Sequence, residues 1–175
     1  IKLRSCVKIC IIGISGAGKT TLAQKLSEEF QLPAYGYDEI YWDKSQIEYV
    51  KNPQDKIKAL VADIKSQDNW IVEGAYDKRL APFFADSSLI IRLKVPYRVC
   101  AFRIIKRFLL SKLTGVRPKE TWMNTLELLR FAKHFDQRLD EFFAANPIFA
   151  EKVKVVHDAQ LCSRAIANHA AAYNH

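Results

Sequence analysis

The sequence predicts a single α/β domain in which helices cover both faces of a five-stranded parallel sheet. Short apolar runs rich in β-branched residues alternate with stretches of helical period along the 175 residues. The first run, from Val7 to Ser15, is almost continuously apolar, as expected for a strand buried on both faces. A glycine-rich turn then leads directly into a helical stretch. Strands connected by helices in this order pair in parallel through right-handed crossovers.

The predicted elements follow one another without a linker or an internal repeat. The helix after the glycine-rich turn runs from Lys19 to Phe30, with its apolar residues on one face. A second helix opens at Pro53, because proline is tolerated at the first helical position. Further strands are expected over 34–38, 70–74, 88–95 and 152–157. Further helices are expected over 78–85, 97–113, 121–145 and 163–172, with a break at 114–118.

The composition is that of one globular domain, with 49% hydrophobic and 26% charged residues. No apolar run approaches the roughly 20 residues that would span a bilayer, so we expect no membrane segment. The four cysteines form neither a C-x-x-C pair nor a zinc-ligand spacing. This pattern favours free thiols in a reducing compartment, and we therefore expect a cytoplasmic protein.

The formal net charge of +8 is concentrated in the second half of the chain. Nine basic residues and no acidic one lie between Arg92 and Lys119. Such a stretch is either a solvated face or a surface for a polyanion, meaning phosphate groups or nucleic acid.

The glycine-rich turn is a phosphate-binding loop (P-loop). Gly13 to Thr20 satisfies G-x-x-x-x-G-K-[ST] between a predicted strand and a predicted helix, which makes a chance glycine turn a weak alternative. Glycines let the loop direct its backbone N–H groups at phosphate oxygens, and the helix adds its positive N-terminal end. Lys19 is expected to reach the β- and γ-phosphates of ATP, and the Thr20 hydroxyl to ligate Mg²⁺. The expected nucleotide-binding residues are Gly13, Ser15, Gly16, Ala17, Gly18, Lys19, Thr20 and Thr21.

The rest of the sequence favours a kinase of small molecules or nucleotides among P-loop proteins. It has no guanine-reading N-K-x-D, and its third predicted strand ends in Glu73-Gly74 where a processive ATPase would end in D-E. An acid, Asp38, lies near the end of the second predicted strand, and arginines follow the fourth. Small-molecule kinases share this distribution of acids and arginines.

Four stretches resemble the adenylate-kinase-like branch of P-loop kinases, and most closely the topology modulation proteins, or adenylate-kinase-related kinases. They are GISGAGKTTLAQKL, YDEIYW, WIVEGAY and LIIRLKVPYRVCAFRIIKR, and together they span about residues 7–107. The resemblance implies a three-layer P-loop NTPase fold in one domain over 1–175. It also implies a helical basic lid over approximately 97–145.

The resemblance also implies roles for four residues outside the P-loop. Glu73 takes the place of an Asp that helps to hold Mg²⁺, although a structural carboxylate is the alternative. Asp38 would bind the acceptor and take the proton of its hydroxyl, or merely cap a turn. Arg103 and Arg107 lie four apart on a predicted helix and would close over the transferred phosphoryl group, or form a solvated basic face. A further arginine pair typical of adenylate kinases is missing, which counts against AMP as the acceptor.

Some features lie outside this scheme. Arg92 and Lys94 interrupt the fourth predicted strand, so they either mark a phosphate-facing end or extend outward to solvent. The four histidines have no metal-ligand spacing and are expected to be structural or exposed.

The sequence therefore predicts an enzyme that transfers the γ-phosphoryl group of ATP, with Mg²⁺, to an unidentified small-molecule or nucleotide acceptor. Two alternatives remain at this point. One is an ATP-binding regulatory protein that contacts DNA through the basic stretch, in line with the topology modulation resemblance. The other is a nucleotide-binding module without turnover.

Overall fold

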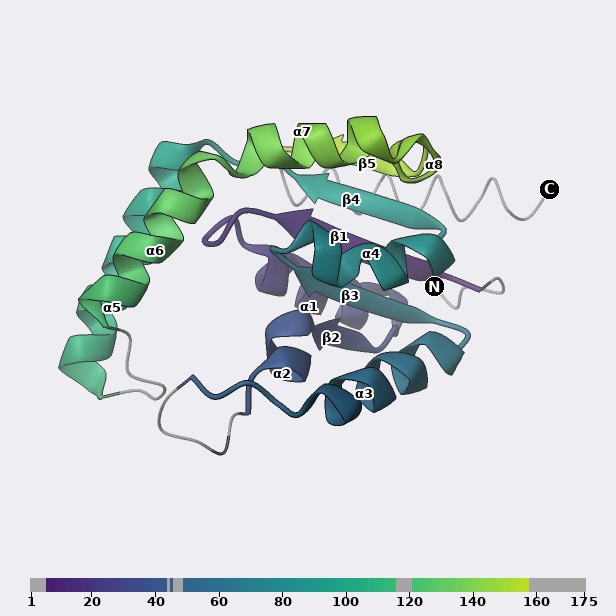
Figure 1. Cartoon of the computed structure of the whole chain (residues 1–175), viewed down its shortest axis with the longest axis horizontal. Helices are drawn as coiled ribbons and strands as arrows, with labels where there is room; N and C mark the ends of the chain where they lie inside the picture. Colours follow the sequence, from purple (N-terminus) through teal and green to yellow (C-terminus); the bar gives the residue numbers. More distant parts are fainter. Residues whose placement is uncertain (1–5, 44, 46–48, 116–120, 158–175) are drawn as a thin grey trace.

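A five-stranded parallel sheet forms the centre of the structure, a computed structural model that describes residues 6–43, 45, 49–115 and 121–157 (Figure 1). Its strands are β1 (Lys8–Gly13), β2 (Ala34–Gly36), β3 (Trp70–Gly74), β4 (Leu89–Leu93) and β5 (Val153–Val156). Every pairing is parallel, and the strand order is β2-β3-β1-β4-β5. The predicted sheet is confirmed.

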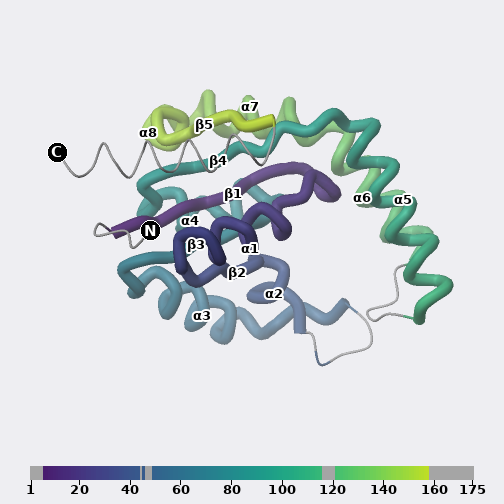
Figure 2. The backbone as a smooth tube through the Cα atoms, turned by 180° about the vertical axis from the view of Figure 1, so that it is seen from behind, coloured from purple at the N-terminus to yellow at the C-terminus, as the bar shows by residue number. Residues whose placement is uncertain are grey.

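Helices cover both faces of this sheet, which explains why its central strands are apolar throughout. Helix α1 lies against one face, whereas α4 and α7 lie against the other (Figures 1 and 2). Ile9, Ile11 and Ile12 of β1 are fully buried as a result. The helices of this layer structure are α1 (Lys19–Phe30), α2 (Tyr37–Tyr41), α3 (Gln54–Ser66), α4 (Asp77–Asp86), α7 (Phe135–Ala145) and α8 (Pro147–Ala150).

Two further helices, α5 (Tyr97–Thr114) and α6 (Trp122–Lys133), form an arm that projects from one end of the sheet. They run side by side in both views (Figures 1 and 2). Sequence periodicity predicts an amphipathic α5 with a buried face, but only Cys100 and Ile104 are buried. Phe102 remains 67% exposed and Leu113 83% exposed, because the arm extends beyond the sheet that would cover them.

The structure corrects two predicted boundaries. The second strand ends at Gly36, so Asp38 lies in the first turn of α2 and not at the end of a strand. The single helix predicted over 121–145 is two helices that meet at His134, whose backbone (φ −104°, ψ 8°) leaves the helical conformation. This change of direction turns α7 from the arm back over the sheet, where Phe135 and Leu139 are buried.

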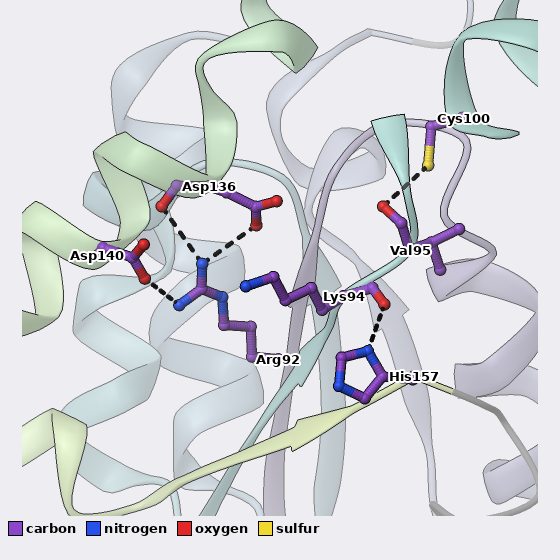
Figure 3. Close-up of polar contacts among 7 residues, drawn as sticks. All are labelled: Arg92, Lys94, Val95, Cys100, Asp136, Asp140 and His157. Atoms are coloured by element: carbon purple, nitrogen blue, oxygen red, sulfur yellow. Dashed lines mark hydrogen bonds and ion pairs between the residues drawn. The ribbon is translucent and has the colours of Figure 1, made fainter. Parts of the chain in front are cut away.

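Arg92 neither faces the phosphate-binding loop nor extends to solvent. It is buried in β4, where Nη2 donates to Asp136 Oδ1 at 3.1 Å and Nη1 donates to Asp140, both on α7 (Figure 3). The charge that interrupts the apolar strand therefore ties the sheet to α7.

Some predictions concern parts of the chain that the structure does not describe. The helix expected over 163–172 lies outside the described residues, as does Cys162. The other three cysteines, Cys6, Cys10 and Cys100, are free thiols as predicted. Within the described ranges, no helix has both the length and the apolar character needed to cross a membrane.

Candidate functional site

The P-loop connects β1, the middle strand of the sheet, to α1. Gly16 (φ 82°) and Gly18 (φ 94°) adopt left-handed backbone conformations that disfavour other residues. The backbone N–H of Ala17 donates to the carbonyl of Ile14 at 3.1 Å, which closes the turn. Because β1 pairs with β3 on one side and β4 on the other, the loop lies where the strand order reverses direction. This is the usual position for ligand binding in open parallel sheets.

Neighbouring backbone surrounds the loop closely. A Cβ atom added to Gly13 would lie 2.8 Å from the carbonyl oxygen of Leu93, at the end of β4. One added to Gly16 would lie 2.9 Å from the carbonyl oxygen of Cys100 in α5. Arg103, also on α5, donates from Nη1 to the carbonyl of Gly16 at 3.0 Å. The loop is therefore held between the sheet and the base of the helical arm.

Lys19 is the first residue of α1 and is buried at the end of the loop. Its Nζ donates to the carbonyl of Ile14 at 3.1 Å. Burial lowers the pKa of this amine, while the negative charges of Glu73 and Asp38 act in the opposite direction. A buried ammonium group at this position is available to an anionic ligand.

Glu73 lies at the end of β3 beside the start of α1. The hydroxyl of Thr20 donates to Glu73 Oε1 at 2.7 Å. Burial raises the pKa of Glu73, opposed by the charge of Lys19 and by the hydrogen bond from Thr20. Among the described residues there is no group of three His, Cys, Asp or Glu side chains that would hold a metal by themselves. Two adjacent oxygen ligands nevertheless fit Mg²⁺, which usually keeps several waters and binds substrate phosphates.

A cleft of about 660 Å³, here called the phosphate cleft, lies over the P-loop. Apart from Gly13, every site residue predicted from the sequence lines it: Ser15, Gly16, Ala17, Gly18, Lys19, Thr20, Thr21, Asp38, Glu73, Arg103 and Arg107. Leu93, Val95 and His157 contribute to its other walls. The ring of His157 is held by contact between its Nδ1 and the carbonyl of Lys94 at 3.1 Å (Figure 3).

A second cleft of about 570 Å³, here called the aromatic cleft, adjoins the first. Four residues line both clefts, namely Ser15, Lys19, Asp38 and Arg107. The remaining lining residues come from the segment after α2, the segment after β3, and α6, and they are Trp42, Tyr49, Ala75, Tyr76, Asn124, Glu127, Leu128 and Phe131. The two clefts therefore meet at a buried amine, a carboxylate and a guanidinium group.

Sequence reasoning missed most of the aromatic cleft. Asn124, Glu127, Leu128 and Phe131 recur at intervals of three and four residues, so their common helix face could have been found. The pattern does not reveal what that face opposes. His157 was also missed, since an isolated histidine after a strand carries no distinguishing signal.

Comparison with known proteins identifies the family to which this fold and this loop belong. A family model described as an AAA domain matches residues 9–108, which include the P-loop, Glu73 and Arg107. The chain belongs to this AAA domain family. No curated protein matches it.

Solved structures share the fold over nearly the whole chain. A gluconokinase from Sinorhizobium meliloti matches with a TM-score of 0.57 at 14% identity, covering 99% of this chain and 95% of that chain. An uncharacterized protein from Eubacterium ventriosum matches with a TM-score of 0.51 at 13% identity, covering 96% and 99%. This member of the AAA domain family thus has the five-stranded parallel α/β fold found in P-loop kinases.

Proposed function

We propose that this protein is a kinase that transfers the γ-phosphoryl group of ATP to a small acceptor molecule. The observation that carries this proposal is the junction of the two clefts at Lys19, Asp38 and Arg107. A donor in the phosphate cleft and an acceptor in the aromatic cleft would meet at these side chains. Phosphoryl transfer depends mainly on such positioning and on charge stabilisation.

The donor side rests on the P-loop. Its backbone N–H groups and Lys19 would bind the β- and γ-phosphates of ATP. Thr20 and Glu73 would hold Mg²⁺, which supplies charge neutralisation to the phosphate oxygens when bound. The hydrogen bond between these two side chains at 2.7 Å supports their assignment to one metal site.

The acceptor side rests on Asp38, which would accept the proton of the attacking hydroxyl. Arg103 and Arg107 would neutralise the transferred group from α5. We further propose that residues 97–145 act as the lid of one kinase domain over 1–175, as in the adenylate-kinase-like and topology modulation proteins that the sequence resembles. The contact between Arg103 and the carbonyl of Gly16 supports this, because it couples the arm to the P-loop.

The proposal is tested by following label from γ-labelled ATP and Mg²⁺ into a panel of acceptors. The panel contains nucleosides, nucleoside monophosphates, sugars and sugar acids, including gluconate because a gluconokinase shares the fold. Wild-type protein is expected to label at least one acceptor class. Label that appears only in free phosphate would contradict a kinase.

Lys19→Ala provides the matched variant. We expect it to lower phosphotransfer by at least about 100-fold, because a cation at the transferred phosphate is lost. Lys58→Ala, which removes an exposed lysine from α3, serves as the control and should retain full activity. Equal turnover by Lys19→Ala and wild type would refute the assignment of the site.

A further inference from the structure

The walls of the aromatic cleft differ in chemistry from the junction. Its unshared lining contains the rings of Trp42, Tyr49, Tyr76 and Phe131, with Asn124 and Glu127 as its hydrogen-bonding side chains. No lysine or arginine is among the described residues that line it beyond the junction. A ligand here meets planar apolar faces, one amide and one carboxylate.

The rings form two pairs that come from separate parts of the chain. Trp42 and Tyr49 contact each other in the segment between α2 and α3, with ring centroids 5.4 Å apart. Tyr76 of the segment after β3 contacts Phe131 of α6 at 4.8 Å. Two such platforms in one cleft suit a ligand that itself has a planar ring.

Two arginines stack on these rings, and the buried Nη1 of one of them, Arg79, has no hydrogen-bond partner among the described residues. Arg79 stacks on Tyr41 at 3.7 Å and on Tyr76 at 4.1 Å. Arg138 stacks on Phe131 at 3.9 Å and lies 3.7 Å from Asp77. Neither arginine lines the aromatic cleft, so the described residues at its far end offer no guanidinium group for bidentate binding of a phosphate or carboxylate group.

The junction offers a carboxylate to an attacking hydroxyl group. Asp38 lines both clefts there, beside Lys19 and Arg107. A hydroxyl group can donate a hydrogen bond to this carboxylate, whereas a dianionic phosphate has no proton to donate and could bind only to Lys19 and Arg107.

From these contacts we propose that the acceptor is an uncharged hydroxyl compound with a planar ring, of the nucleoside class. This inference rests on the proposed kinase function. The hydroxyl oxygen forms a bond to the γ-phosphorus, and the bond from that phosphorus to the bridging oxygen breaks. The electron pair leaves with ADP, and the hydroxyl proton passes to Asp38. Asn124 and Glu127 bind the edge of the ring while the aromatic pairs hold its faces.

The first test compares phosphotransfer to adenosine, guanosine, cytidine, uridine and thymidine with transfer to their monophosphates and to gluconate. Labelled nucleoside monophosphate is the expected product. Transfer only to monophosphates or to gluconate would overturn the inference while leaving the proposed function intact.

Calorimetric titration with the same nucleosides separates binding from turnover. Nucleoside binding without transfer to any acceptor would support the aromatic cleft as a nucleoside site and contradict the kinase. Neither binding nor transfer would overturn both.

Two matched pairs of variants locate the site. Trp42→Leu is expected to raise the KM for the nucleoside about tenfold through loss of ring stacking, with the KM for ATP unchanged. Tyr35→Leu, at a half-buried tyrosine of β2 outside both clefts and outside the lid, should change neither KM. Glu127→Lys should shift preference from nucleosides toward monophosphates or sugar acids, because it places a cation in the cleft. Glu151→Lys makes the same charge change at an exposed residue outside the clefts, and an equal shift in that variant would contradict the inference.

Discussion

Lys19 and Glu73 oppose each other at the end of the P-loop, and burial penalises the charge on both. Burial lowers the pKa of the Lys19 amine and raises the pKa of the Glu73 carboxyl. Both groups are charged in the arrangement that would bind ATP and Mg²⁺. As the pH falls, Glu73 is protonated at a higher pH than an ordinary carboxyl. As the pH rises, Lys19 loses its proton at a lower pH than an ordinary lysine.

We therefore expect a narrow pH profile of kcat/KM for ATP. The acid limb should lie at a higher pH than the pKa of an ordinary Glu, and the alkaline limb at a lower pH than the pKa of an ordinary Lys. Both shifts should be visible in kcat/KM, because this quantity reports the pKa values of the free enzyme. Measurement of kcat/KM against pH for wild type, Glu73→Gln and Lys19→Arg tests this. Glu73→Gln should move the acid limb to lower pH, and Lys19→Arg should move the alkaline limb to higher pH. Limbs at the ordinary pKa values of both groups would contradict the expectation.

Individual residues were predictable from the sequence where their geometry depends on adjacent positions. Gly16, Gly18, Lys19 and Thr20 belong to one short loop, and the sequence alone places them around a phosphate. Tyr76 had no such signal, because its role in the aromatic cleft depends on Phe131, which is far away in the sequence.

At the scale of elements, the contact between β4 and α7 depends on an ion pair with unequal burial. The Arg92 side chain is 9% exposed, whereas those of Asp136 and Asp140 are 52% and 63% exposed. Loss of the arginine leaves two carboxylates that water can solvate. Loss of the carboxylates leaves a buried guanidinium charge without its acidic partners.

We therefore expect the double variant Asp136→Ala with Asp140→Ala to lower the free energy of unfolding by about 3–5 kcal/mol. Arg92→Met should cost less, because its apolar side chain fills much of the same space. Urea denaturation compares the two. Asp86→Ala, which removes the partner of a lysine that is 31% exposed, Lys65, serves as a control and should cost only about 0–1 kcal/mol. A larger loss in Arg92→Met than in the double variant would be inconsistent with this account.

The positions of most helices and strands were predictable from the sequence, but the way in which they pack against one another was not. The bounds of α1 and β3 match the prediction, because Gly18 directly precedes α1 and Gly74 ends β3. The division into α6 and α7 was missed, since apolar spacing continues across His134 and only the position of the sheet makes the chain turn there.

At the scale of the whole molecule, alternation of strands and helices was enough to predict the parallel sheet. The aromatic cleft was not predictable in this way. The cleft brings together residues after α2, residues after β3 and one face of α6. Helix α6 contributes to it because α6 runs beside α5, at the end of the sheet where the P-loop lies (Figure 1). A cleft built from separate segments leaves no contiguous pattern in the sequence.

A kinase consumes ATP by transfer to an acceptor and not by hydrolysis. The most direct measurement is ADP production by wild-type protein, with Mg²⁺, in the presence and absence of a nucleoside. A kinase predicts little ADP without the acceptor and, with it, one phosphorylated nucleoside for each ADP formed. ADP production at the same rate with and without the acceptor, accompanied by free phosphate, would contradict the claim and indicate an ATPase.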